Sequence, residues 1–184
     1  MVKSVSKRIM QSIATNEKYS TDELEQMEYA LVTILFESVK IISLIITFSL
    51  FGYFNEVIII TGIMCAVKPF IGGYHEDTQI RCFLSSVAIT FAILAISLNS
   101  SLNIVSSAVI SIICLICIWY RAPVLNPRMP MTKKELIMKN KIIGTSITAV
   151  FAVIALIFIK YNIYSDCITW TITFQTLLLF NKLK

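Results

Sequence analysis

A histidine and a cysteine seven residues later could carry out thiolate chemistry in this chain. Both lie in the run Gly72-Gly73-Tyr74-His75-Glu76-Asp77-Thr78-Gln79-Ile80-Arg81-Cys82, and the 184 residues contain no other histidine. An imidazole next to a thiol can take its proton and leave a thiolate, which is a strong nucleophile. Ionisable groups beside membrane segments are costly and are therefore candidates for functional sites. His75 and Cys82 are the first catalytic candidates on this ground.

The spacing of this pair requires a break in the helix that would otherwise carry it. On one unbroken helix His75 and Cys82 would share a face but lie about 10.5 Å apart along the axis, whereas a nucleophile and its base need heavy atoms about 3 Å apart. The preceding double glycine permits a break, and Asp77 or Thr78 can cap a new helix. The sequence predicts Cys82 in the early turns of that helix, where the dipole favours a thiolate. The alternative is a chance pairing of an interfacial histidine with a cysteine at the start of a span.

The composition indicates a membrane protein. Hydrophobic residues make up 57% of the chain and charged residues 15%, and the mean hydropathy is +0.78, whereas soluble domains carry about 25% charge. A spanning helix needs about 20 mostly apolar residues. Six stretches fit: 34–53, 55–70, 83–99, 103–120, 142–159 and 165–181.

These stretches predict an all-α fold, a polytopic membrane helix bundle with about six transmembrane segments. The whole chain, 1–184, is expected to be one integral membrane domain. A four-span arrangement, in which 55–70 is re-entrant, is the alternative, because Pro69 disfavours further helix at the end of that stretch.

The first thirty residues form a lead-in of a different character. Val2, Val5, Ile9 and Ile13 recur at three- and four-residue steps with basic residues between them. This pattern predicts an amphipathic helix on an anionic membrane surface. The alternative is a lead-in that only anchors the chain. A second helix is predicted to start near Thr21 and to lead into the first span.

The segment 121–141 is predicted to be a basic cytoplasmic loop. Glu135 is the one acid in it, and its prolines favour an extended start. Its six basic residues are Arg121, Arg128, Lys133, Lys134, Lys139 and Lys141. The positive-inside rule places this loop in the cytosol, and one crossing per span then places the 71–82 loop and both termini there too. The loop could also bind acidic headgroups or an acidic peptide. Nucleic acid is not an expected partner, because the basic run is short and has no aromatic pattern.

The remaining candidate groups favour structural roles. Cys114 and Cys117 have the spacing of a redox motif but lie inside an apolar stretch, where cysteine packs as a small hydrophobe. One histidine and scattered cysteines lack the spacing of a zinc site, so no metal or other cofactor is expected. Glu37 and Lys40, three residues apart, are interpreted as a local ion pair. In the alternative interpretation, Glu37 points towards the catalytic loop.

The run Lys68-Pro69-Phe70-Ile71-Gly72-Gly73-Tyr74-His75, followed at Cys82 by an apolar stretch, resembles the accessory gene regulator B family. So do the length, the membrane content, and Arg121-Ala122-Pro123-Val124 followed by a segment rich in proline and lysine. This family comprises bacterial membrane cysteine endopeptidases that process precursors of quorum-sensing peptides. The resemblance covers nearly the whole chain and implies that Cys82 is the nucleophile and His75 its base. The family often has an arginine where Lys68 stands, and lysine keeps the charge but loses bidentate carboxylate binding.

The resemblance also implies a reaction and its partners. A Cys82 thiolate would release the C-terminal tail of a membrane-bound precursor and form a thioester, which a substrate thiol would close to a thiolactone. A homodimer in the bacterial cell membrane is expected, because family members self-associate. Possible substrate-binding residues are Lys68, Arg128, Lys133 and Lys134. The rival functions are a non-enzymatic transporter and a signalling scaffold.

Overall fold

The computed structural model describes residues 21–73, 78–124 and 134–180. The chain divides into two compact units, Met1–Thr47 and Phe48–Lys184, and each is described by itself. The all-α prediction is confirmed, because the described residues form helices and one isolated β-bridge. The predicted amphipathic helix within residues 1–13 lies outside the described residues.

The first unit contains most of helix α2 (Thr21–Ser49). From Thr21, the first described residue, the helix continues without a break from the polar lead-in into the apolar span Gln26–Ser49. Lys40 and Glu37 form an ion pair across one turn, which confirms the local interpretation of this pair.

The second unit consists of helices connected by short segments. They are α3 (Phe54–Ile71), α4 (Gln79–Asn99), α5 (Ile104–Arg121), α6 (Lys134–Ile157), the 3₁₀ turn η1 (Phe158–Lys160) and α7 (Asn162–Leu178). In the described part of the chain, five helices are long and apolar enough to cross a membrane: α2, α3, α4, α5 and α6 with η1. The predicted polytopic bundle is thus confirmed.

The predicted stretch 55–70 agrees with α3 to within one residue at each end. The helix includes Pro69 and ends at Ile71, because a proline in the last turn removes only one N–H donor. α3 is therefore a full 18-residue helix. The basic segment expected to be a loop up to residue 141 becomes helical at Lys134, where Glu135 lies in the first turn and complements the helix dipole.

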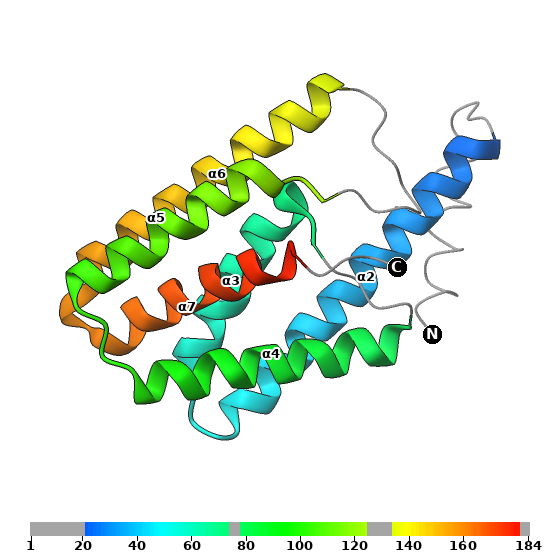
Figure 1. Cartoon of the computed structure of the whole chain (residues 1–184). Coiled ribbons are helices and arrows are strands. Elements are labelled where there is room, and N and C mark those ends of the chain that lie inside the picture. Colours follow the sequence, from blue (N-terminus) through cyan, green and yellow to red (C-terminus); the bar gives the residue numbers. More distant parts are fainter. Residues whose placement is uncertain (1–20, 74–77, 125–133, 181–184) are drawn as a thin grey trace. The chain divides into compact units, whose positions relative to one another are not determined.

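Helix α7 lies at the centre of the second unit (Figure 1, orange to red) and packs against α3, α4, α5 and α6. It has 17 residues and ends at Leu178, three residues before the predicted stretch ends. Ile168 and Ile172 are buried in one apolar cluster with Val67 of α3 and Ile118 of α5. The surrounding helices therefore shield α7 from the bilayer.

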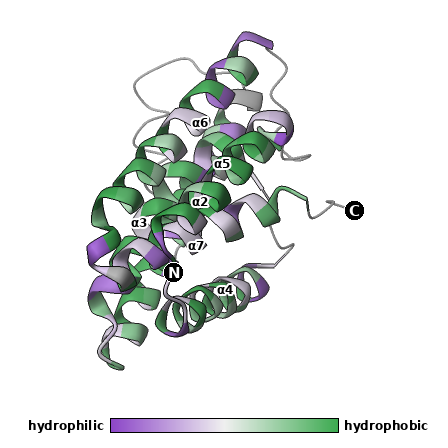
Figure 2. Cartoon of the chain, turned by 60° about the vertical axis from the view of Figure 1, so that its left-hand side comes forward, coloured by the Kyte–Doolittle hydropathy of each residue, from purple (hydrophilic) through white to green (hydrophobic). Residues whose placement is uncertain are grey.

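The outer helices present apolar side chains outward. Figure 2 shows hydrophobic residues along α5 and α6 and hydrophilic residues at the end of α6 where Lys134 lies. On α5 the exposed apolar residues include Val105, Val109, Ile112 and Ile116. A continuous apolar surface of this kind fits lipid chains as its surroundings.

Helices α3 and α6 approach closely at a glycine. A Cβ built on Gly144 would lie 2.6 Å from Ile71 Cγ2 and 3.1 Å from Phe70 Cβ. Small residues allow such close approach between membrane helices. Gly144 therefore fixes the C-terminal end of α3, from which the candidate site begins.

Candidate active site

The predicted helix break is present between α3 and α4. α3 ends at Ile71, and Gly72 follows with φ 72° and ψ −149°. Gly73 has φ 131°. These backbone angles are accessible to glycine and strained for other residues. The double glycine thus turns the chain out of α3, as the sequence predicts.

A backbone bridge holds this turn against a distant segment. The Val124 N–H donates to the Ile71 carbonyl oxygen at 2.9 Å, and Gly72 pairs with Val124 in a parallel β-bridge. A Cβ on Gly72 would collide with the Val124 carbonyl oxygen. Position 72 therefore requires glycine for two reasons: its backbone angles and its close contact with the Val124 carbonyl oxygen. The bridge places the start of the 71–82 loop and the start of the basic segment at the same end of the unit.

Cys82 lies in the first turn of α4. Thr78 is the N-cap, and its hydroxyl oxygen accepts from the Arg81 N–H at 3.4 Å. The Cys82 N–H donates to the Thr78 carbonyl oxygen at 2.9 Å, and the Cys82 side chain is partly buried. The structure therefore places Cys82 where the sequence predicts it, in the early turns of the helix that follows the break.

Two of the other predicted site residues, Lys68 and Lys134, lie in the described part of the chain. His75, Arg128 and Lys133 lie outside the described residues, so their roles stay predictions. Lys134 is exposed as the first residue of α6. Lys68 lies in the last turn of α3 and lines a narrow cavity with Gly72 and Gly73.

The remaining cysteines differ from Cys82 in their surroundings. None of the five forms a disulfide, and Cys114 and Cys167 are buried. The Cys114 Sγ donates to Thr173 Oγ1 at 3.8 Å, which joins α5 to α7. The placement of Cys114 fits a packing role. Within residues 21–73, 78–124 and 134–180, no group of three or more His, Cys, Asp or Glu residues could hold a metal ion.

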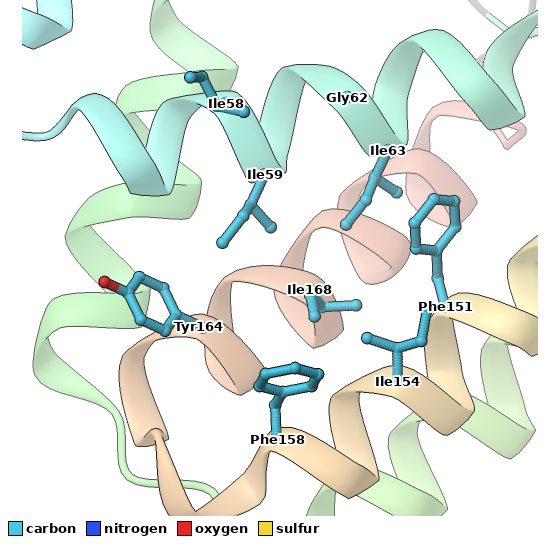
Figure 3. Close-up of a pocket in the computed structure, with 9 residues that line it drawn as sticks. All are labelled: Ile58, Ile59, Gly62, Ile63, Phe151, Ile154, Phe158, Tyr164 and Ile168. Carbon is cyan, nitrogen blue, oxygen red and sulfur yellow. The ribbon is translucent and has the colours of Figure 1, made fainter.

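A larger cavity of about 440 Å³ lies in the other half of the unit, between α3, α6 and α7. Figure 3 shows Ile59, Phe151, Phe158 and Ile168 pointing into it, with the Tyr164 hydroxyl at its edge. It has no acid, base or thiol among its lining residues. Its chemistry suits an apolar chain and not a reaction, so the candidate active site remains at the Gly72–Cys82 end.

The sequence analysis missed the polar groups buried on α7. Asp166, near the N-terminal end of α7, is fully buried, and its Oδ2 accepts from Ser100 Oγ at 3.0 Å. The Trp170 indole N–H donates to the same Ser100 oxygen at 3.0 Å. Gln175, near the other end of the helix, is also buried. An acid and an amide inside an apolar stretch were the available signal.

Comparison with known proteins identifies the family. Residues 6–179 match the profile described as accessory gene regulator B. The chain belongs to the accessory gene regulator B family. It is 40% identical over 178 residues to "Putative AgrB-like protein 1" of Clostridium perfringens, an alignment that covers 97% of this chain and 95% of that protein.

A second relative of this accessory gene regulator B protein is more distant. "Protein FsrB" of Enterococcus faecalis is 29% identical over 119 residues, which cover 63% of this chain and 48% of that protein. No solved structure matches the chain. The family is involved in accessory gene regulation and quorum sensing and is linked to the processing of peptide precursors.

Proposed function

We propose that this protein is a membrane cysteine endopeptidase that processes a quorum-sensing peptide precursor, with Cys82 as the nucleophile and His75 as its base. The observation that carries the proposal is the position of Cys82, partly buried in the first turn of α4 directly after the helix break. Family membership supports it, because the family is linked to precursor processing.

The proposed reaction has two acyl transfers. His75 takes the thiol proton, and the Cys82 sulfur forms a bond to a peptide carbonyl carbon of the precursor. The C–N bond of that peptide breaks, and the C-terminal tail leaves as an amine that receives a proton from His75. A thiol within the substrate then attacks the resulting thioester, which closes a thiolactone and returns Cys82 to its initial state.

The location of the site fits the second transfer. Exchange of one thioester for another loses little free energy, whereas attack by water would hydrolyse the intermediate irreversibly. Cys82 is partly buried at the end of an apolar helix. Exclusion of water at such a boundary favours ring closure over hydrolysis.

Cleavage in proteoliposomes tests the proposal. The substrate is the cognate precursor, a short peptide with an internal cysteine and an acidic tail. We expect Cys82→Ala and His75→Ala to abolish cleavage and Cys82→Ser to lower it strongly, with each variant as helical as the wild type. Cleavage by folded Cys82→Ala would contradict the proposal and favour a transporter or a signalling scaffold.

The basic residues after the bridge are proposed to hold the acidic tail of the precursor. Lys134 is exposed at the start of α6, and Lys133 precedes it. Charge reversal of both is expected to raise the KM for the precursor and to weaken the dependence of cleavage on salt. Lys160, the last residue of η1 at the opposite end of the same span, offers a control for charge reversal far from this segment. An unchanged KM with normal expression would remove this role.

The transporter alternative has less support than the endopeptidase proposal, as three hydroxyl groups on α7 show. They belong to Thr171, Thr173 and Thr176. Transport sites need polar groups inside the membrane that are available to a substrate. These hydroxyls on α7 each donate to the carbonyl oxygen four residues earlier in the same helix. These three hydroxyls are therefore satisfied within α7 and give no support to a transport pathway along them.

A further inference from the structure

One buried side chain near the candidate site has a hydrogen-bonding capacity that the fold does not use. Gln175 of α7 is 3% exposed, and neither its Nε2 nor its Oε1 has a hydrogen-bond partner among the described residues. A buried amide without a hydrogen-bond partner destabilises the folded state. Buried polar groups in proteins are therefore nearly always paired. The unused amide therefore points to an occupant that the described part of the chain does not supply.

The amide lies at a cavity beside the double-glycine turn. Gln175 and Leu178 line the α7 side of this cavity, and Lys68, Gly72 and Gly73 line the other side. The cavity holds about 10 Å³, which is close to the room that one water-sized group needs. A single carbonyl oxygen fits a space of this size, whereas a side chain does not.

Space for an incoming backbone exists at Gly73. A Cβ built there would meet nothing closer than Leu178, at 3.9 Å. Because glycine has no side chain, another backbone can approach this position closely. Gly72 does not offer this space, because the Val124 carbonyl oxygen already occupies it.

We propose that Gln175 is a substrate-binding residue whose side-chain N–H donates to one main-chain carbonyl oxygen of the precursor peptide at the Gly73 side of the turn. This inference rests on the proposed peptidase function for the identity of the ligand. The amide oxygen remains available to a main-chain N–H, so that a side-chain amide matches both groups of a peptide unit. Lys68, which lines the same cavity, adds a positive charge that favours an oxygen ligand.

A structural water in the same cavity is the competing occupant. The two can be separated because a water supports the fold with or without substrate, whereas a peptide carbonyl contributes only to binding. Replacement of Gln175 by methionine keeps the shape and removes both hydrogen-bonding groups. Replacement by glutamate keeps the acceptors and removes the donor.

Binding of the precursor to a catalytically inactive variant tests the proposal without relying on cleavage. The full-length Cys82→Ala protein in nanodiscs is titrated with a fluorescein-labelled synthetic precursor, and its Kd is compared with those of Cys82→Ala carrying Gln175→Met, Gln175→Glu or Ser111→Ala. Ser111 is a matched control, because its buried hydroxyl on α5 also lacks a partner among the described residues and it does not line this cavity. The melting temperature of each variant is measured without peptide.

We expect Gln175→Met and Gln175→Glu to weaken binding about five- to tenfold, the usual effect of one lost hydrogen bond. Ser111→Ala should leave the Kd unchanged. The same Kd for the Cys82→Ala parent and for the parent carrying Gln175→Met would overturn the inference. If Gln175→Met also had a lower melting temperature, the cavity would be assigned to a structural water.

The outcomes separate this inference from the proposed function. If the parent binds the precursor and Gln175→Met weakens that binding while the wild type does not cleave it, the endopeptidase proposal fails and the binding role of Gln175 stands. If the wild type cleaves the precursor and Gln175→Met binds it normally, the endopeptidase proposal stands and the binding role of Gln175 fails. Absence of saturable binding by the parent would contradict both.

Discussion

The two ends of α7 use buried polar groups in opposite ways. At the N-terminal end, Ser165 donates to the Ala155 carbonyl oxygen at 2.8 Å, and Asp166 accepts from Ser100 through Oδ2, whereas its Oδ1 has no partner among the described residues. At the C-terminal end, Gln175 has no hydrogen-bond partner in the described part of the chain. The first end ties helices together, whereas the second keeps an amide available beside the double-glycine turn. Burial of a polar residue thus accompanies a structural contact at one end of the helix and, in the role proposed for Gln175, substrate binding at the other.

The difference follows from what each polar group faces. Asp166 faces the connection between α4 and α5, where Ser100 Oγ and the Leu102 N–H donate to its Oδ2 at 3.0 and 3.5 Å. Gln175 faces a cavity at the end of α3 instead. Variants at the first end should therefore change stability alone, and variants at the second end should change what the protein binds or cleaves.

Gly72→Ala is expected to have the largest effect on stability. The new methyl group would adopt a strained positive φ and also collide with the Val124 carbonyl oxygen. We expect a loss of about 2–4 kcal/mol from strain and overpacking together, together with a large loss of cleavage. Unfolding in detergent and cleavage in proteoliposomes measure the two effects.

Gly52→Ala is the matched control for this variant. Gly52 also has a positive φ, of 89°, but a Cβ there would meet no atom within 4 Å. We expect only the strain cost of about 1–2 kcal/mol and normal cleavage. Equal losses for the two variants would show that the bridge to Val124 contributes nothing.

Gly144→Ala should have an intermediate effect. Its Cβ would lie 2.6 Å from Ile71 Cγ2, so that α6 and the end of α3 must separate slightly. We expect a loss of about 1–3 kcal/mol from overpacking and a lower kcat, because the turn to the candidate site begins at Ile71. In Gly62→Ala the new methyl group meets no atom within 4 Å, and helix propensity predicts a gain of up to about 1 kcal/mol. Unchanged unfolding of Gly144→Ala would contradict the close approach of these helices.

Asp166→Ala should have a smaller effect than Gly72→Ala. It leaves Ser100 Oγ and the Leu102 N–H without their acceptor, for which we expect a loss of about 1–2 kcal/mol. Asp166→Asn keeps one oxygen acceptor and should lose less. The KM for the precursor should stay unchanged in both, since this end of α7 is assigned a structural role. A raised KM in either Asp166 variant would contradict the assignment of a purely structural role to the N-terminal end of α7.

The local features of the site were predictable from the sequence. The helix break follows from two adjacent glycines, and Thr78 is a good N-cap because its hydroxyl oxygen can accept from the first turn of α4. The position of Cys82 in that turn depends on the same few residues. Helix formation and capping are decided over a few neighbouring positions, which a single sequence records.

The features that depend on tertiary packing were not predictable in this way. Nothing near Gly72 in the sequence indicates that Val124 will contact it, and nothing near Gly144 indicates a contact with Ile71, because each partner comes from a distant segment of the chain. The sequence also does not show that α7 packs against α3, α4, α5 and α6, because these contacts join segments far apart in the chain. The unused amide of Gln175 becomes visible only when its neighbours are known.

The most direct test of the central claim is to capture the acyl-enzyme. Proteoliposomes turning over the precursor are quenched in acid, and the protein is digested and mapped by mass spectrometry. The account predicts that the N-terminal fragment of the precursor is joined to Cys82 through a bond that hydroxylamine cleaves, and that Cys82→Ala carries no such adduct. Cleavage with the fragment attached to another residue, or continued cleavage by folded Cys82→Ala, would contradict the claim that Cys82 is the nucleophile.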